Sequence, residues 1–197
     1  MIWRYKLSKR CVLIIGGARS GKSCFAQELT LKLGEPALFV ATATADDEEM
    51  RYRIEEHQRV RPATWNTIEV TTRIANQIDH KIGEAQVVII DCITLLINNI
   101  FSQYINSASE QIDTSLIEGE VTSEINELAD CINRTDASFV IVTNEVGTGL
   151  VPTNKMGRLY RDLLGKANQI LAQRVDEVYL MIAGLPVPIK PPRYSGG

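Results

Sequence analysis

The string Gly16 to Ser23, GGARSGKS, constrains this chain more than any other feature of its sequence. It follows the apolar run Cys11 to Ile15 and precedes an amphipathic segment, Cys24 to Leu33. Such a string between a strand and a helix is typical of a phosphate-binding loop, whose backbone N–H groups surround phosphate oxygens. Lys22 would reach the β- and γ-phosphates, and Ser23 would hold Mg²⁺. The alternative, a glycine-rich turn without a ligand, is disfavoured by this context.

Five apolar runs alternate with longer amphipathic segments along the chain. The runs are apolar at successive residues, as expected of strands that are covered on both faces. The alternation therefore predicts an α/β fold with a mostly parallel sheet flanked by helices. The expected strands are Val12–Ile15, Ala37–Ala41, Val87–Ile90, Phe139–Thr143 and Val178–Ile182.

The two ends of the chain differ from this pattern. Pro186 to Ile189 follows the last expected strand too closely for a helical crossover, so it returns as an antiparallel edge or forms a tail. The length of 197 residues suits one domain. We expect a single P-loop nucleotide-binding catalytic domain over residues 11–190 and a flexible tail over residues 191–197. Residues 1–10 form an N-terminal extension that is either an edge segment or disordered.

Composition excludes several classes of partner. The formal charge is -3 and the 21 basic residues are dispersed, which argues against nucleic acid and anionic membranes and favours a small-molecule substrate. No apolar run approaches the roughly 20 residues that span a bilayer, and residues 1–10 lack a secretory signal, so we expect a cytoplasmic protein without membrane insertion. The four cysteines form no metal or disulfide pattern and are expected to be reduced core residues; they are Cys11, Cys24, Cys92 and Cys131.

A second phosphate-site element is the apolar run Val87 to Asp91, which ends in a carboxylate. This is the form of a Walker B element, whose aspartate binds Mg²⁺ directly or through water. Asp91 could instead cap a helix over Cys92–Leu96. With the P-loop present, the metal role is favoured.

The chain has two histidines, and one of them has a suggestive position. His57 lies in a charged amphipathic segment, Asp46 to Val60, which predicts a helix. From spacing alone, His57 and His80 are typical of solvated histidines. However, the segment after the second strand of such a sheet emerges at the same carboxyl edge as the P-loop, which favours His57 as a site residue.

A series of residues along the chain carries a family resemblance in its order and spacing: GGARSGKS, Ala41-Thr42-Ala43, Asp47 to Met50, Arg53-Ile54, His57, Arg61-Pro62, Trp65, Asp91 to Thr94, Val142 to Pro152, Arg158, Arg161-Asp162, Gly165, Asn168-Gln169 and Asp176 to Val178. With these residues the chain resembles the bifunctional adenosylcobinamide kinase/adenosylcobinamide-phosphate guanylyltransferases of cobalamin biosynthesis. The resemblance covers roughly residues 11 to 190 and implies a RecA-like P-loop fold, a homotrimer, and a covalently guanylylated histidine that matches His57.

The resemblance implies two reactions. In the first, ATP or GTP with Mg²⁺ gives its γ-phosphoryl group to the hydroxyl of the corrinoid adenosylcobinamide, aided by Lys22 and Ser23. In the second, neutral His57 attacks the α-phosphorus of GTP, expels pyrophosphate and passes GMP to the cobinamide phosphate. The implied catalytic residues are His57 and Lys22, and the implied metal ligands are Ser23 and Asp91. The implied nucleotide contacts are Gly16, Gly17, Ala18, Arg19, Ser20, Gly21, Lys22, Ser23, Ala41, Thr42, Ala43, Gln58, Arg59, Val60, Arg61, Glu69 and Asp91.

Three residues depart from the family pattern. Glu56 precedes His57 and would raise its pKa if the two are close. Val60 stands where glycine is common and restricts the turn, and Asp91 replaces the more usual glutamate. Two other functions stay open: a kinase without the covalent histidine, and a regulatory P-loop protein. The apolar residues Leu95 to Ile97 and Ile100-Phe101 serve either a subunit interface or the core.

Overall fold

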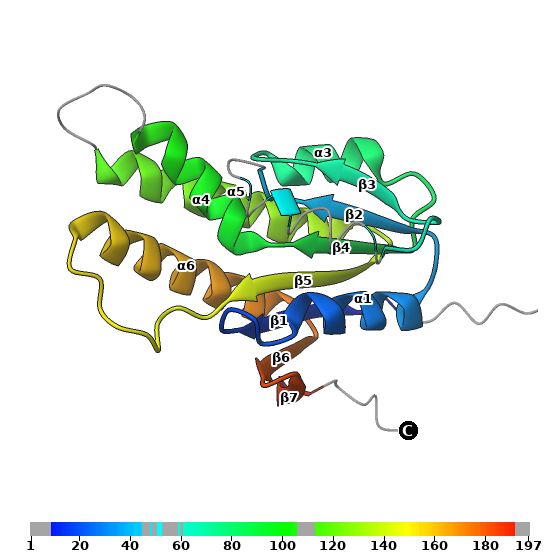
Figure 1. Cartoon of the computed structure of the whole chain (residues 1–197). Helices are drawn as coiled ribbons and strands as arrows, with labels where there is room; N and C mark the ends of the chain where they lie inside the picture. Colours follow the sequence, from blue (N-terminus) through cyan, green and yellow to red (C-terminus); the bar gives the residue numbers. More distant parts are fainter. Residues whose placement is uncertain are drawn as a thin grey trace, which may run out of the picture.

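The computed structural model describes residues 9–44, 48, 51–52, 59, 61–105 and 113–191. These residues contain a seven-stranded sheet with the order β3-β2-β4-β5-β1-β6-β7, in which only β7 is antiparallel to its neighbour (Figure 1). The expected mostly parallel sheet with helices on both sides and an antiparallel edge is thereby confirmed. The strands are β1 Cys11–Gly16, β2 Ala37–Ala41, β3 Asn66–Glu69, β4 Val87–Asp91, β5 Ser138–Asn144, β6 Glu177–Ile182 and β7 Leu185–Lys190.

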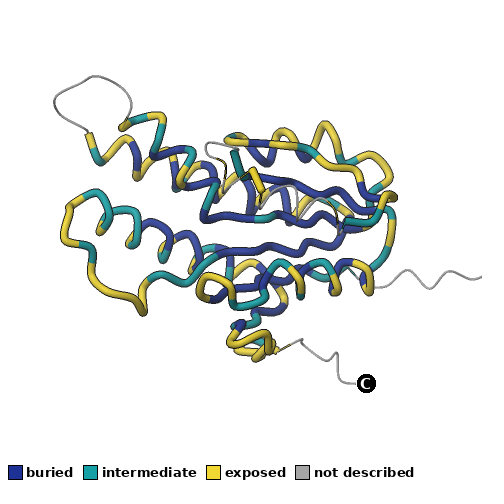
Figure 2. The backbone as a smooth tube through the Cα atoms, viewed as in Figure 1, coloured by how far each residue is buried: buried dark blue, intermediate teal, exposed yellow. Residues whose placement is uncertain are grey.

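Helices cover both faces of the sheet, and each face has its own hydrophobic cluster (Figures 1 and 2). On one face, Ala26 and Leu29 of α1 pack with strand residues such as Val12 and Ile14. On the other face the remaining helices pack with alternate strand residues such as Leu13. This alternation explains the unbroken apolar runs of the sequence. The helices are α1 Lys22–Leu33, α3 Ile74–Lys81, α4 Ile93–Ile105, α5 Thr114–Arg134 and α6 Lys155–Arg174.

The structure adds one strand that the sequence pattern did not predict. The edge strand β3 pairs in parallel with β2, but its residues NTIE are exposed or half-buried. An edge strand needs no continuous apolar run, so hydrophobicity alone does not reveal it. The five expected strands are present: β2 has the expected bounds, and each of the other four is longer by one or two residues.

The hairpin formed by β6 and β7 resolves the alternatives for Pro186 to Ile189 in favour of an antiparallel edge. Its two-residue turn, Ala183 and Gly184, has positive φ angles of 52° and 83°, as in the tight turns that suit twisted strands. Pro186 and Pro188 lie opposite Met181 and Tyr179 in β6.

Near the chain ends, Arg10 is held against the start of β6. Its Nε and Nη2 donate to the two carboxylate oxygens of Glu177 at 2.7 and 2.8 Å, and the Cys11 N–H donates to Asp176. Arg10 is thus ordered by a buried carboxylate. Residues 1–8 and 192–197 lie outside the described part of the chain.

Two expectations about buried residues can be compared with the structure. Leu96, Ile97, Ile100 and Phe101 are buried within the chain, which favours their core role, while Leu95 is half-buried. All four cysteines are free, but the expectation that all are core residues was wrong for Cys24, which is exposed. Cys24 faces away from the sheet because α1 buries positions such as Ala26 and Leu29. None of the helices in the described ranges is long and apolar enough to cross a membrane.

Candidate nucleotide site

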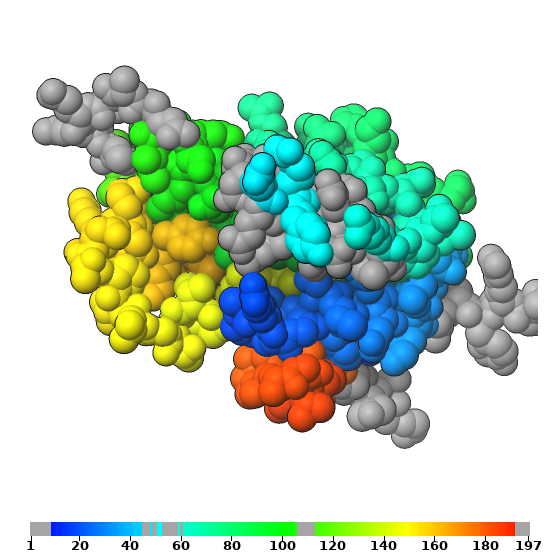
Figure 3. All heavy atoms as spheres, viewed as in Figure 1, coloured from blue at the N-terminus to red at the C-terminus, as the bar shows by residue number. Residues whose placement is uncertain are grey.

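The loop between β1 and α1 has the geometry of a phosphate-binding loop. Gly16 is the last residue of β1, and α1 begins at Lys22, directly after Gly21. Gly21 has φ +94°, and a Cβ there would lie 3.1 Å from Cα of Gly184 in the β6–β7 turn. The Gly184 N–H donates to the Ser20 carbonyl at 3.0 Å, so the hairpin directly supports the loop. Figure 3 shows the loop (dark blue) at the surface, next to this hairpin (orange-red).

Two polar groups inside the loop are well suited to an anion. Lys22 is only 8% exposed, and its ammonium group donates to the Gly17 carbonyl at 2.6 Å. Burial lowers the pKa of Lys22, while the nearby Asp91 carboxylate acts in the opposite direction. Within the described residues, the buried Ser20 hydroxyl has no hydrogen-bond partner. A phosphate group would compensate the desolvated cation and satisfy the hydroxyl.

Three residues at one register level lie at the carboxyl ends of neighbouring strands. Ala41 of β2 pairs with Glu69 of β3 on one side and with Asp91 of β4 on the other. Side chains at the same level of adjacent parallel strands project from the same face. The two carboxylates are thus set on the α1 face of the sheet, the side of the P-loop lysine.

Arg61 lies close to both carboxylates. Burial lowers the pKa of its guanidinium, and Asp91 and Glu69 oppose this shift. Its central carbon lies 3.5 Å from the centroid of the Phe39 ring, and this ring is in turn stacked on Trp65. Because it lies on an aromatic face and near two carboxylates, the Arg61 guanidinium is a positive charge in a fixed position at the strand ends.

The segment after β2 is fixed to the end of β4 by hydrogen bonds. The buried Thr42 hydroxyl donates to the Cys92 carbonyl and accepts its N–H, both at 2.7 Å. The Asn99 amide donates to the Thr42 carbonyl at 2.9 Å. Burial raises the pKa of Cys92 to about 12, so its thiol stays neutral. Residues 41–43 therefore have a defined position beside Asp91. The alternative role of Asp91 as a helix cap is not favoured, because the residue that directly precedes α4 is Cys92.

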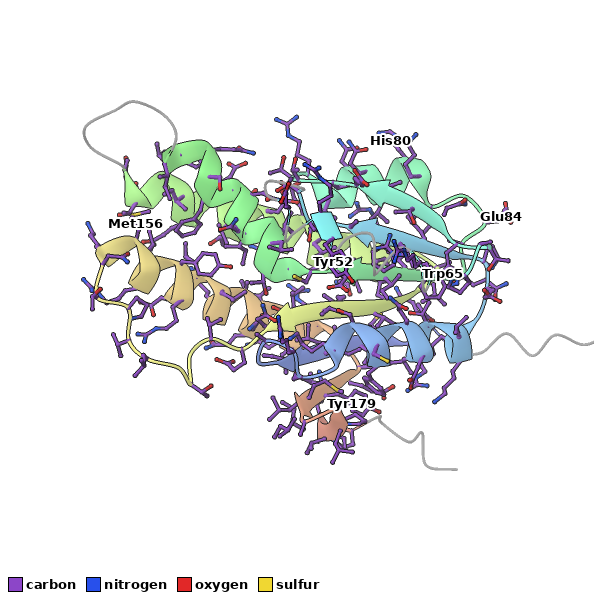
Figure 4. The ribbon with its side chains drawn as sticks, in the orientation of Figure 1. Tyr52, Trp65, His80, Glu84, Met156 and Tyr179 are labelled. Carbon is purple, nitrogen blue, oxygen red and sulfur yellow. The ribbon has the colours of Figure 1, made fainter. Side chains whose placement is uncertain are left out.

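The structure brings most of the expected nucleotide contacts to one edge of the sheet. The P-loop, residues 41–43, Arg61, Glu69 and Asp91 all lie at the carboxyl ends of the parallel strands, and Arg59 is exposed. His57, Gln58 and Val60 lie outside the described residues, as do Glu56 and most of the helix expected over Asp46 to Val60. His80 is exposed on α3, on the side of the molecule away from the P-loop (Figure 4). Sequence reasoning missed Phe39 beneath Arg61, because an aromatic residue inside an apolar strand gives no such signal.

Comparison with known proteins identifies the family. A family model described as "CobU: Cobinamide kinase / cobinamide phosphate guanyltransferase" matches residues 12–189. The chain belongs to this family. The matched range agrees with the resemblance drawn from the sequence, which covers roughly residues 11 to 190.

Curated relatives of the family match over almost their whole length. The "bifunctional adenosylcobalamin biosynthesis protein CobU" of Escherichia coli is 37% identical over 91% of this chain and 99% of its own. The protein of the same name from Salmonella typhimurium is 38% identical with the same coverage. The "bifunctional adenosylcobalamin biosynthesis protein CobP" of Pseudomonas aeruginosa is 34% identical over 90% of this chain and 96% of its own. Among solved structures, the RadB recombinase aligns with a TM-score of 0.48 at 14% identity, over 87% of this chain and 73% of its own.

Proposed function

We propose that this chain is a bifunctional enzyme of cobalamin biosynthesis. It phosphorylates adenosylcobinamide with ATP or GTP and then transfers GMP from GTP to adenosylcobinamide phosphate, which gives adenosylcobinamide-GDP and pyrophosphate. The observation that carries this proposal is the family match over residues 12–189. The P-loop with its buried lysine supplies the triphosphate site that both reactions need.

In the kinase reaction, the substrate hydroxyl oxygen bonds to the γ-phosphorus while the bond to the β,γ-bridging oxygen breaks and the hydroxyl proton is released. Lys22 holds the transferred group and neutralises its charge, and the backbone of the P-loop orients the β-phosphate. Because Lys22 is already desolvated, its attraction to the phosphate is little weakened by water.

Ser23 and Asp91 are suited to hold Mg²⁺. Both offer oxygen ligands: Ser23 lies in the first turn of α1, and Asp91 is the last residue of β4, with a carboxylate that opposes the lowering of the Lys22 pKa. Among the described residues no cluster of three or more metal-ligating side chains was found. Mg²⁺ commonly takes one or two protein ligands and completes its shell with phosphates and water. The ion would neutralise charge on the transferred phosphoryl group.

In the guanylyl transfer, an imidazole nitrogen of His57 bonds to the α-phosphorus of GTP and pyrophosphate leaves. An oxygen of the cobinamide phosphate then attacks the same phosphorus and releases the histidine. Neutral imidazole is a good nucleophile near pH 7, and its protonated form is a good leaving group. Splitting the transfer in this way makes each displacement easier.

Guanosine recognition is assigned to the strand ends beside the P-loop. Glu69 and Asp91 can accept hydrogen bonds from the guanine N1–H and amino group or from ribose hydroxyls. Arg61 is held close to both carboxylates by the Phe39 ring and stabilises their charge. The backbone of residues 41–43 and the residues Gln58, Arg59 and Val60 complete the proposed contacts.

Further properties are proposed from family resemblance. Residues 11–190 would act as one catalytic domain, the protein would be cytoplasmic, and it would assemble as a homotrimer. Native mass measurement of the purified protein tests the trimer, and a mass of one or two chains would contradict it.

The deciding experiment is protein labelling with α-labelled GTP and Mg²⁺. We expect an acid-labile, alkali-stable protein-bound GMP that disappears in His57→Ala and persists in His80→Ala, the matched histidine control. Labelling that persists in His57→Ala would exclude this nucleophile. Wild-type protein that phosphorylates adenosylcobinamide but is never labelled would be a kinase only.

A second experiment addresses the P-loop. Lys22→Ala should strongly reduce phosphoryl transfer to adenosylcobinamide, whereas Lys32→Ala, at an exposed position of the same helix, should leave it unchanged. Undiminished transfer by Lys22→Ala would exclude the proposed role of the loop. Nucleotide binding without either transfer reaction would identify a regulatory P-loop protein instead.

A further inference from the structure

Asn144 occupies a special place in the sheet. Strand β5 lies between the P-loop strand β1 and β4, the strand that ends in Asp91. Asn144 is the last residue of β5 and pairs with Gly16, the first residue of the P-loop string. Asp91 pairs with Val142, two residues earlier on the same strand. Asn144 therefore stands between the phosphate-binding loop and the Asp91 carboxylate.

Two buried side chains form hydrogen bonds with the backbone N–H and carbonyl groups of Asn144. Its N–H donates to the Thr94 hydroxyl at 2.9 Å, and its carbonyl accepts a hydrogen bond from the Asn168 amide at 3.0 Å. Strand β4 ends at Asp91, so it offers no backbone partner at this level. Side chains of α4 and α6 therefore make the hydrogen bonds to Asn144 that a neighbouring strand would otherwise make.

The residues that hold Asn144 are themselves fixed. The Thr143 hydroxyl donates to Asn168 at 2.8 Å, and the Tyr160 hydroxyl donates to the Thr94 carbonyl at 2.9 Å. Thr94, Thr143 and Asn168 are 8%, 0% and 6% exposed. Buried polar groups are destabilising unless they are fully hydrogen-bonded, so this network imposes one conformation on the end of β5.

The side chain of Asn144 points to the P-loop face of the sheet. Thr143 bonds to Asn168 of α6, so it faces the side opposite α1. Successive strand residues face opposite sides, which directs Asn144 to the side of α1 and Asp91. The residue is half-buried, and among the described residues its amide group has no hydrogen-bond partner. A neutral amide can donate to a phosphoryl oxygen without changing the charge of the site.

We propose that Asn144 contacts the γ-phosphoryl group of the bound triphosphate, and that Thr94 and Asn168 are the positioning residues that fix it there. This inference rests on the nucleotide site of the proposed function and adds a residue that distinguishes triphosphate from diphosphate. Lys22 contacts phosphate in both nucleotides, whereas the Asn144 amide contacts the γ-phosphate, which only the triphosphate has.

The test is equilibrium binding of Mg-GDP and of Mg-GTP with a β,γ-imido bridge, which resists hydrolysis, to the full chain. In Asn144→Ala we expect GDP affinity within about twofold of wild type and about tenfold weaker binding of the triphosphate analogue, the size of a lost hydrogen bond to a charged group. Asn144→Asp should weaken the analogue further, because it adds negative charge. Asn133→Ala, at an exposed position of α5, is the matched control and should change neither affinity.

The positioning residues have their own pair of variants. Thr94→Val removes the acceptor for the Asn144 N–H and should reduce the triphosphate preference, whereas Thr94→Ser retains the hydroxyl and should keep it. An equal loss of both affinities in Asn144→Ala, or no loss of either, would overturn the inference and leave the P-loop site intact. Wild-type protein that binds neither nucleotide would instead refute the proposed function.

Discussion

Replacing Glu124 by glutamine is a sharp test of how the fold supports the candidate site. Glu124 lies on α5 and is 5% exposed. Its two carboxylate oxygens accept the N–H groups of Arg73 and Ile74, at 2.8 and 2.7 Å, at the start of α3. Helix α3 has no side-chain cap of its own, so a neighbouring helix caps it. Glutamine keeps one acceptor oxygen but turns an NH₂ group toward the second N–H.

The expected loss of stability follows from these contacts. A buried N–H without a partner costs about 1–3 kcal/mol, and loss of a negative charge at a helix N-terminus adds about 0.3–1 kcal/mol. We expect the free energy of unfolding to fall by about 2–3 kcal/mol in Glu124→Gln, which is roughly 5–10 °C in Tm for a chain of this size. Urea denaturation followed by circular dichroism measures the difference. Glu120→Gln, at an exposed position of the same helix, is the control.

The difference between wild type and variant should also depend on pH. Burial raises the pKa of Glu124 in the folded chain. The folded state therefore holds this proton more tightly than the unfolded state, and the free energy of unfolding decreases as pH rises from the usual carboxyl pKa to the raised one. Glutamine does not titrate, so the advantage of wild type should be largest on the acid side of this window and constant above it. A loss below about 0.5 kcal/mol, the usual range for surface substitutions, or a loss equal to that of Glu120→Gln, would refute the capping argument.

Three other predictions concern the loop, the cation and the thiols. Gly21→Ala should weaken nucleotide binding and lower the free energy of unfolding by about 1–2 kcal/mol, because a left-handed conformation is unfavourable with a side chain and the Cβ would press on Gly184. An unchanged melting temperature together with an unchanged nucleotide affinity would contradict this prediction. Arg61→Lys keeps the charge but loses the planar stacking on Phe39, so the affinity for guanine nucleotides should fall severalfold. An affinity equal to that of wild type would exclude a role for the stacked geometry. With a thiol reagent such as dithionitrobenzoate, one cysteine, Cys24, should react rapidly in the native protein and all four after unfolding; a second fast thiol would contradict the burial of the others.

The sequence predicted the centre of the fold because the parallel strands are buried on both faces. Their unbroken apolar runs, such as Val87 to Ile90, need no other information. Strand β3 was missed because only its backbone pairing with β2 makes it a strand, and its side chains are exposed or half-buried. Cys24 was misplaced because an apolar residue type does not reveal which face of a helix it occupies.

Prediction of a candidate site was possible where the sequence carries a local string. The P-loop, and Asp91 at the end of an apolar run, could be recognised from the sequence itself. The stacking of Arg61 on Phe39 and the hydrogen bonds of Asn144 join residues that are distant in the chain, so no local pattern signals them. The assignment of His57 as nucleophile stays a prediction, since this residue lies outside the described ranges.

The prolines of β7 determine how the sheet ends. The two-residue turn makes Ile182 and Leu185 a hydrogen-bonded pair, so Pro186 and Pro188 fall at positions whose backbone nitrogens face the open edge. Proline has no N–H, and an incoming strand would find no donor at either position. The exposed apolar side chains of this strand therefore cannot recruit another chain into a continuous sheet. The hairpin can thus brace the phosphate loop at an exposed rim without becoming a starting point for aggregation.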